Sequence, residues 1–190
     1  MLRHFLVVFV SSVVVATDET EYNIECDEVI NPELYEPSLS NREYILPHNM
    51  NIGDEIGLFF HTTTDEPVSI SLFETPQGNV PDNYETATFY IQHRFDDDQT
   101  VFNSKKGFKW GKQELINNEW RMGWTVPVVI RKHQKHFEVE TESFIYRYAF
   151  SQLIDKNSEV RTIHTKGAGL TGISFTCYGW MYNKRRNFIE

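Results

Sequence analysis

Short runs that alternate between apolar and polar residues recur along most of this 190-residue chain and constrain its fold more than any other feature. Residues 68–73 alternate strictly, 88–95 alternate, and 126–130 form one continuous apolar run. A two-residue period is typical of a strand with one buried face, and a short apolar run is typical of a fully buried strand. No window carries a sustained 3.6-residue period with helix caps. The sequence therefore predicts an all-β protein.

Turn-forming residues separate these runs. Segments rich in Gly, Asp, Asn, Lys and Pro occur at 75–79, 96–98, 105–107 and 166–169. Such residues favour tight turns because they tolerate unusual backbone angles or fix them. Many short strands at this spacing predict a two-sheet antiparallel β-sandwich.

The N-terminus has the pattern of a signal peptide over residues 1–16. A cationic start is followed by the apolar run 5–15, a small residue at Ala16 and acidic residues just beyond. An apolar run of this length is shorter than the roughly 20 residues that a membrane-spanning helix needs. The alternative is a buried N-terminal strand. We expect a secreted, extracellular protein with no membrane anchor, in which the acidic residues 17–43 form an N-terminal extension.

Charge and cysteine content narrow the partners and the covalent structure. The formal net charge is −9, which disfavours nucleic acid because phosphate binding needs a basic surface. The only cysteines are Cys26 and Cys177, and two cysteines allow one intrachain pairing. Secretion would permit that disulfide.

The segment 89–95 carries the most informative polar pattern. Alternation places Tyr90, Gln92 and Arg94 on one face of a strand, opposite its apolar residues. Asn103 and Trp110 follow and are separated by a tight turn, so a hairpin would bring them beside that polar face.

This set of side chains suits sugar binding. An aromatic ring packs on the apolar face of a hexose, while Arg, Asn and Gln bond its hydroxyls. The alternative is that Trp110 belongs to the core and Arg94 is a solvated strand residue.

These residues resemble the carbohydrate-recognition domain of galectins. The family pattern runs His-x-Asn-x-Arg-Phe, Val-x-x-Asn-Ser and Trp-Gly-x-Glu. This chain has Arg94-Phe95, then 101–104 reading Val-Phe-Asn-Ser, then Trp110-Gly111, with seven residues from the Asn to the Trp. The resemblance covers roughly 45–175. It implies a jelly-roll sandwich of the galectin/concanavalin kind over 44–178, with 179–190 as a C-terminal tail.

The resemblance also implies roles for individual residues. Arg94 would bond the axial galactose hydroxyl and the next sugar, Asn103 the primary hydroxyl, and Trp110 would stack under galactose. Tyr90 stands in place of the family's His, and Gln92 in place of its first Asn.

Two further departures follow the tryptophan. Gln113 replaces the family's Glu and loses the charge that orients Arg94, which should weaken the site. Leu115 stands where many members carry a second Arg. Glu114 could substitute for the missing Glu only if the turn shifts by one residue.

The resemblance implies a secreted lectin that binds β-galactoside-like glycans non-covalently, without metal or cofactor. The alternative is a galectin-fold protein-interaction module that has lost sugar binding. An enzyme is not expected: a glycosidase needs two facing carboxylates, and Glu138 and Glu140 share a strand face that we expect to meet solvent. In a galectin-like sandwich the first and last strands are neighbours, which would bring Cys26 and Cys177 within reach if the N-terminal extension folds back. The oligomeric state is not predicted.

Two segments contain side chains of the types that bind metals. Carboxylates at 96–98 could hold Ca²⁺, but no spaced ligand loop follows, so a solvated turn is expected. His133 and His136 lie among cations, and we expect no Cys or carboxylate to accompany them, so a surface turn is expected there too.

Overall fold

Antiparallel strands make up the regular structure of the chain. The computed structural model describes residues 28–30, 41–62, 66–74, 86–107, 109–117, 120–121, 123–150, 158–167 and 169–175. Within these ranges there are thirteen strands and no helix, and therefore no helical segment with the length and hydropathy to cross a bilayer. The strands are β1 (Glu28–Ile30), β2 (Asn41–Met50), β3 (Glu55–His61), β4 (Val68–Phe73), β5 (Ala87–Arg94), β6 (Gln99–Lys106), β7 (Lys109–Trp110), β8 (Glu114–Asn117), β9 (Thr125–Lys132), β10 (His136–Glu140), β11 (Ile145–Ala149), β12 (Val160–Lys166) and β13 (Gly169–Phe175).

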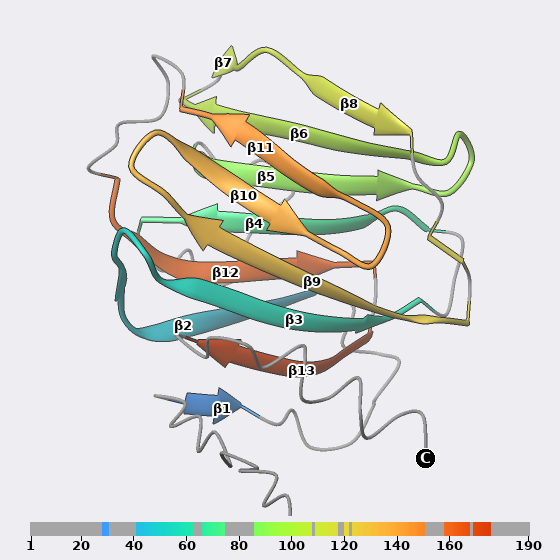
Figure 1. The fold of residues 1–190 in the computed structure, drawn as a ribbon, viewed down its shortest axis with the longest axis horizontal. Helices are drawn as coiled ribbons and strands as arrows, with labels where there is room; N and C mark the ends of the chain where they lie inside the picture. Colours follow the sequence, from blue (N-terminus) through green and yellow to red (C-terminus); the bar gives the residue numbers. More distant parts are fainter. Residues whose placement is uncertain are drawn as a thin grey trace, which may run out of the picture.

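The strands form two sheets that pack face to face (Figure 1). One sheet has the order β1-β13-β3-β9-β10-β11, and the other has the order β2-β12-β4-β5-β6-β7, with β8 also pairing with β6. Every neighbouring pair is antiparallel. The predicted two-sheet antiparallel sandwich is therefore confirmed.

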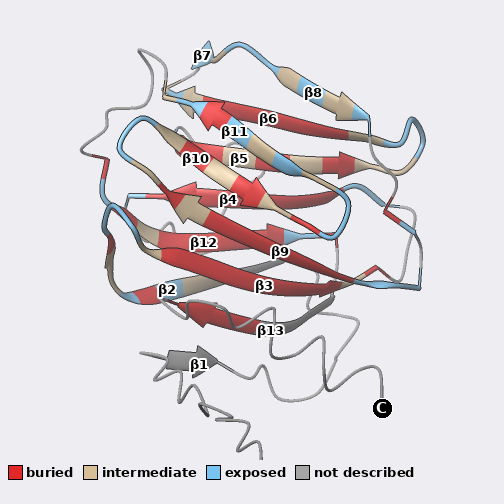
Figure 2. Cartoon of the chain, viewed as in Figure 1, coloured by how far each residue is buried: buried red, intermediate tan, exposed pale blue. Residues whose placement is uncertain are grey.

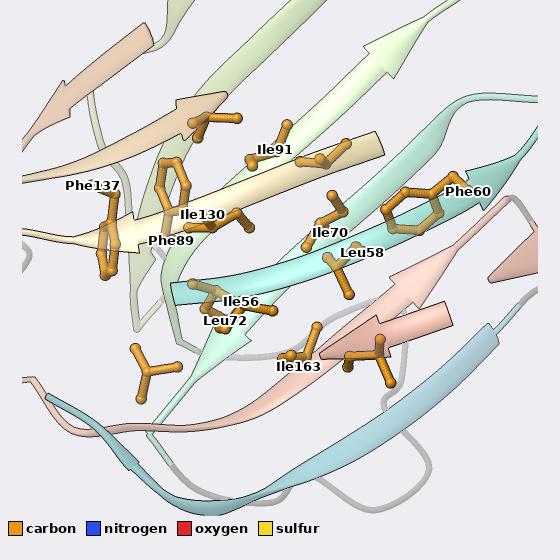
Figure 3. Packing of buried hydrophobic residues seen from close by; sticks show 14 of the residues in the cluster. Ile56, Leu58, Phe60, Ile70, Leu72, Phe89, Ile91, Ile130, Phe137 and Ile163 are labelled. Carbon is orange, nitrogen blue, oxygen red and sulfur yellow. The ribbon is translucent and has the colours of Figure 1, made fainter. Parts of the chain in front are cut away.

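The core lies between the sheets and follows from the alternation in the sequence. Phe89 of β5 stacks on Phe137 of β10, across the two sheets, with ring centroids 4.8 Å apart. Ile70 and Leu72 of β4 face the same layer as Ile56 of β3 (Figure 3). Full burial of one such side chain stabilises the fold by about 1.5–3 kcal/mol. Burial is greatest in the middle strands and falls toward β7 and β8 at one edge of the second sheet (Figure 2).

The first and last strands lie side by side. β1 pairs with β13, with Glu28 opposite Phe175. β1 lies within the acidic segment 17–43, and β2 begins at Asn41. The predicted signal peptide, both cysteines and the tail at 179–190 lie outside the described residues.

Candidate functional site

The polar residues of β5 lie on its outward face. Burial alternates along the strand: Phe89 and Ile91 are buried in the core, whereas Tyr90, Gln92 and Arg94 are partly exposed. The two-residue period of the strand accounts for this placement. These three side chains form one row on the surface turned away from the other sheet.

A tight hairpin brings the later residues to the same surface. Asn103 of β6 pairs directly with Tyr90, and Trp110 of β7 pairs with Lys105. The turn between β6 and β7 contains Gly107, whose φ of 58° suits glycine because it has no Cβ to clash. We call the outward surface of β5–β8 the site face. It comprises Tyr90, Gln92, Arg94, Asn103, Trp110, Gln113 and Leu115.

Trp110 is a surface residue and does not belong to the core. Its side chain is 47% exposed. The Tyr90 ring meets it edge-on, with centroids 5.3 Å apart and planes at 63°, and Lys105 Nζ lies 5.3 Å from the Trp110 centroid. Tyr90 therefore packs beside Trp110 and leaves about half of the indole open to a ligand.

Some polar atoms of the site face already form hydrogen bonds within the chain. Arg94 Nε donates to Gln92 Oε1 over 3.2 Å. Asn103 Oδ1 accepts the backbone N–H of Ser104 over 2.8 Å, and Asn103 is 7% exposed. The guanidinium is thus held by a neutral partner, and Asn103 is fixed in orientation, with its amide NH₂ as the group that can donate to a ligand.

A register shift beside Asn103 positions Gln113. Gly111 N–H donates to Ser104 O, while Glu114 pairs with Phe102. Two residues, Lys112 and Gln113, therefore lie opposite the single residue Asn103, which is the count of a β-bulge. Gln113 is exposed. Since its neighbour Glu114 pairs with core-facing Phe102, strand alternation puts Gln113 on the site-face side of the sheet.

Glu114 points away from the site face. As the partner of Phe102, which is buried in the core, it faces the other sheet, and its carboxylate accepts a hydrogen bond from the Tyr146 hydroxyl of β11. Burial and this carboxylate raise the pKa of Tyr146 to about 12. Glu114 therefore does not replace the missing Glu beside Arg94. Leu115, which stands where many galectins carry a second Arg, is 47% exposed.

His93 lies beneath the site face and was not singled out by the sequence. It is fully buried, stacks on Trp120 with centroids 4.8 Å apart, and its Nδ1 lies 3.1 Å from Thr100 Oγ1. Desolvation lowers its pKa to about 4, against the opposing pull of Asp98 and Asp97. At neutral pH it is an uncharged core residue. The sequence does contain a signal for its burial, because alternation along β5 puts His93 on the same face as Phe89 and Ile91.

Of the two segments with possible metal ligands, only the one with His133 and His136 has its ligand atoms close together in the structure. Residues 96–98 are exposed and form a turn, in which Asp98 has a φ of 48°. His133 and His136 lie at the turn between β9 and β10, but the prediction that no carboxylate accompanies them is wrong. Glu138 is two residues beyond His136 on the same face of β10, and the possible ligand atoms of the three residues lie within 4.8 Å of one another.

The family model of the galactoside-binding lectins matches residues 42–175. The chain belongs to this family. Galectins are non-enzymatic lectins, so this domain is a carbohydrate-binding lectin domain and not an enzyme. No curated protein sequence matches it.

Solved galectins share the fold at low sequence identity. Xenopus laevis galectin-Ib is 15% identical, with a TM-score of 0.58 over 71% of this chain and 98% of its own. Toad ovary galectin, solved with thio-digalactose, is 12% identical, with a TM-score of 0.59 over 72% and 98%. Caenorhabditis elegans galectin LEC-6 is 14% identical, with a TM-score of 0.57 over 72% and 90%.

Proposed function

We propose that the site face binds β-galactoside-like glycans outside the cell, non-covalently and without metal. One observation carries the proposal: the half-exposed indole of Trp110 lies on the same surface as Arg94 and Asn103. An apolar plate beside fixed polar groups matches the two sides of a hexose. Toad ovary galectin, of the same family, has been solved with thio-digalactose and with N-acetylgalactose.

Each residue of the site face has its own role in the proposed binding of the sugar. Trp110 supplies the stacking surface, Arg94 the planar donor fork, and Asn103 an amide whose orientation is fixed by Ser104. Tyr90 and Gln92 lie beside these residues on the site face, and Gln113 lies at the bulge. Because Arg94 has a neutral partner, its orientation is weakly fixed, and we expect a dissociation constant of roughly 0.1–10 mM, or about 3–5 kcal/mol.

We also propose secretion and a disulfide between Cys26 and Cys177. Secretion rests on the signal-peptide pattern of residues 1–16. The disulfide is supported by the pairing of Glu28 with Phe175, since continuing this antiparallel register by two residues in each direction would set Cys26 opposite Cys177. Directly opposite Cβ atoms lie about 4.5–5.5 Å apart, close to the separation that a disulfide needs.

The second candidate is a protein-interaction module without sugar binding. Exposed Leu115 on the site face favours it, because an aliphatic side chain stands where polar groups would meet a second sugar. Trp110 adds a second exposed large apolar side chain to this face, and aromatic side chains are enriched at protein interfaces.

A glycan array and a lactose titration separate the two functions. The secreted protein, labelled and applied to the array in EDTA, should retain galactose-terminated glycans, and lactose should bind in the same buffer. A flat array together with no lactose response at 50 mM, roughly five times the weakest expected dissociation constant, would refute glycan binding and favour the protein-interaction module.

A further inference from the structure

Two histidines and a glutamate gather on the outer surface of the sheet opposite the site face. His136 and Glu138 are two residues apart on β10, so both point outward, while Phe137 between them is fully buried. His133 follows the end of β9, and its backbone N–H donates to His136 O over 2.9 Å, which closes the hairpin. The β9–β10 turn thereby brings the three side chains together. We call them the His-His-Glu cluster.

The imidazole nitrogens of the cluster are poorly satisfied. The rings of His133 and His136 stack with centroids 4.6 Å apart and planes at 18°. The Nε2 atom of each ring is shielded from solvent and has no hydrogen-bond partner. Shielded polar atoms without a partner are uncommon, because each costs about 1–3 kcal/mol of desolvation. A cation at the Nε2 edges of the two rings, reached by each in-plane lone pair after side-chain rotation, would satisfy both nitrogens.

Glu138 can supply a third ligand without losing its main ion pair. Its Oε2 accepts from Arg147 Nε over 3.0 Å. Its Oε1 lies 3.9 Å from His133 Nε2 and has only a 3.4 Å bond from Arg131 Nη1. That same Arg131 nitrogen bonds Glu140 over 2.6 Å, so the bond to Glu138 is the weaker of the two. Oε1 is therefore the oxygen that can turn toward a metal.

We propose that His133, His136 and Glu138 form a Zn²⁺ site on the β9–β10 hairpin. Two imidazoles and one carboxylate are ligands that zinc accepts, leaving a fourth position for water. Ligand atoms around tetrahedral zinc lie about 3.3 Å apart, so atoms now within 4.8 Å must move closer by side-chain rotation. The site lies on β10, in the sheet opposite β5 and β6, so zinc takes no part in sugar contact (Figure 1).

Zinc titration of the tag-free secreted protein tests this site. ZnCl₂ followed by calorimetry at pH 7.5 should show one equivalent bound and should raise the melting temperature. His133→Gln and His136→Gln should each weaken binding by at least about tenfold, since even the loss of a residue that only supports a metal ligand costs that much. The control is His61→Gln, a half-buried histidine of β3 outside the cluster, which should bind zinc as the wild type does.

Cobalt gives an independent readout of the ligand set. Co²⁺ in a four-coordinate nitrogen and oxygen site absorbs visible light, and this band should appear with the wild type and with His61→Gln but not with His136→Gln. Circular dichroism establishes that the variants are folded. If the wild type binds no zinc, or if the folded cluster variants bind it as tightly as the wild type, the site does not exist.

Discussion

Arg94 Nε donates a hydrogen bond to Gln92 Oε1, two residues earlier on the same strand face, over 3.2 Å. A neutral amide thus holds the guanidinium that the galectin pattern assigns to galactose. The amide oxygen carries only a partial charge and accepts one bond, whereas a carboxylate pairs its full charge with the guanidinium and can accept two bonds. Arg94 is therefore less firmly oriented here than beside a carboxylate. This contact gives a structural reason for expecting weak sugar binding.

Restoring a carboxylate at the bulge should tighten sugar binding. In Gln113→Glu the new carboxylate can compete with Gln92 for Arg94, and replacing an amide partner by an ionised one should gain about 1 kcal/mol, or roughly fivefold in affinity for lactose. Calorimetry with lactose measures the change. Gln134→Glu, in the exposed β9–β10 turn, adds the same charge away from the site face and should leave affinity unchanged. Equal affinities for all three proteins would contradict the role given to Gln113.

The bond from Tyr146 to Glu114 should stabilise the packing of β11 over β8. Tyr146→Phe removes it and should lower the free energy of unfolding by about 1 kcal/mol in urea at pH 7. Because the folded-state pKa of Tyr146 is raised from 10.0 to about 12, the stabilisation is complete below pH 10 and is lost as pH rises toward 12. The wild type and Tyr146→Phe should therefore converge in stability across that range. A difference that stays constant to pH 12 would refute the assignment.

Strand alternation and motif spacing predicted most of the site's architecture. The period of two in 88–95 placed Tyr90, Gln92 and Arg94 on one face, and the turn after Asn103 placed Trp110 on the next short strand. Both inferences are local, because they need only a strand period and a hairpin.

The surroundings of Glu114 and the His-His-Glu cluster depend on contacts that sequence spacing does not encode. The bulge turns Glu114 toward Tyr146, a residue of the other sheet 32 positions away. The residues of the β9–β10 turn alone do not indicate the His-His-Glu cluster, because its third member, Glu138, lies farther along β10 on the same face as His136. The contact between Glu114 and Tyr146 depends on how the two sheets pack. The His-His-Glu cluster depends on how the β9–β10 hairpin closes.

Burial of His93 should make the domain sensitive to acid. Its folded-state pKa is lowered from 6.5 to about 4, so between these values the unfolded chain binds a proton that the folded chain does not. The stabilisation is complete above pH 6.5 and is lost as pH falls to 4. Lowering pH from 7 to 4 should cost the wild type on the order of 3 kcal/mol more than His93→Gln. Urea denaturation at a series of pH values measures the free energy of unfolding of the wild type and of His93→Gln. If this free energy falls equally with pH in both proteins, the prediction is wrong.

The secreted protein should contain no free thiol. Closing so long a loop through Cys26 and Cys177 stabilises a fold by on the order of 5 kcal/mol in the entropic description, less any strain. Thiol titration of the denatured, unreduced protein should therefore find none, and Cys26→Ser should lower the melting temperature as much as the double variant with Cys177→Ser. Two titratable thiols per chain would show that the pair does not form.

The most direct test of the lectin assignment is lactose binding by two tryptophan variants. Trp110→Ala should abolish binding while leaving the melting temperature within a few degrees of the wild type, because its side chain is 47% exposed. Trp124→Ala is the matched control: Trp124 is 53% exposed, lies on the segment leading into β9 of the other sheet, and packs under Arg121. It should bind lactose as the wild type does. Lactose affinity that survives in folded Trp110→Ala would contradict the proposed site.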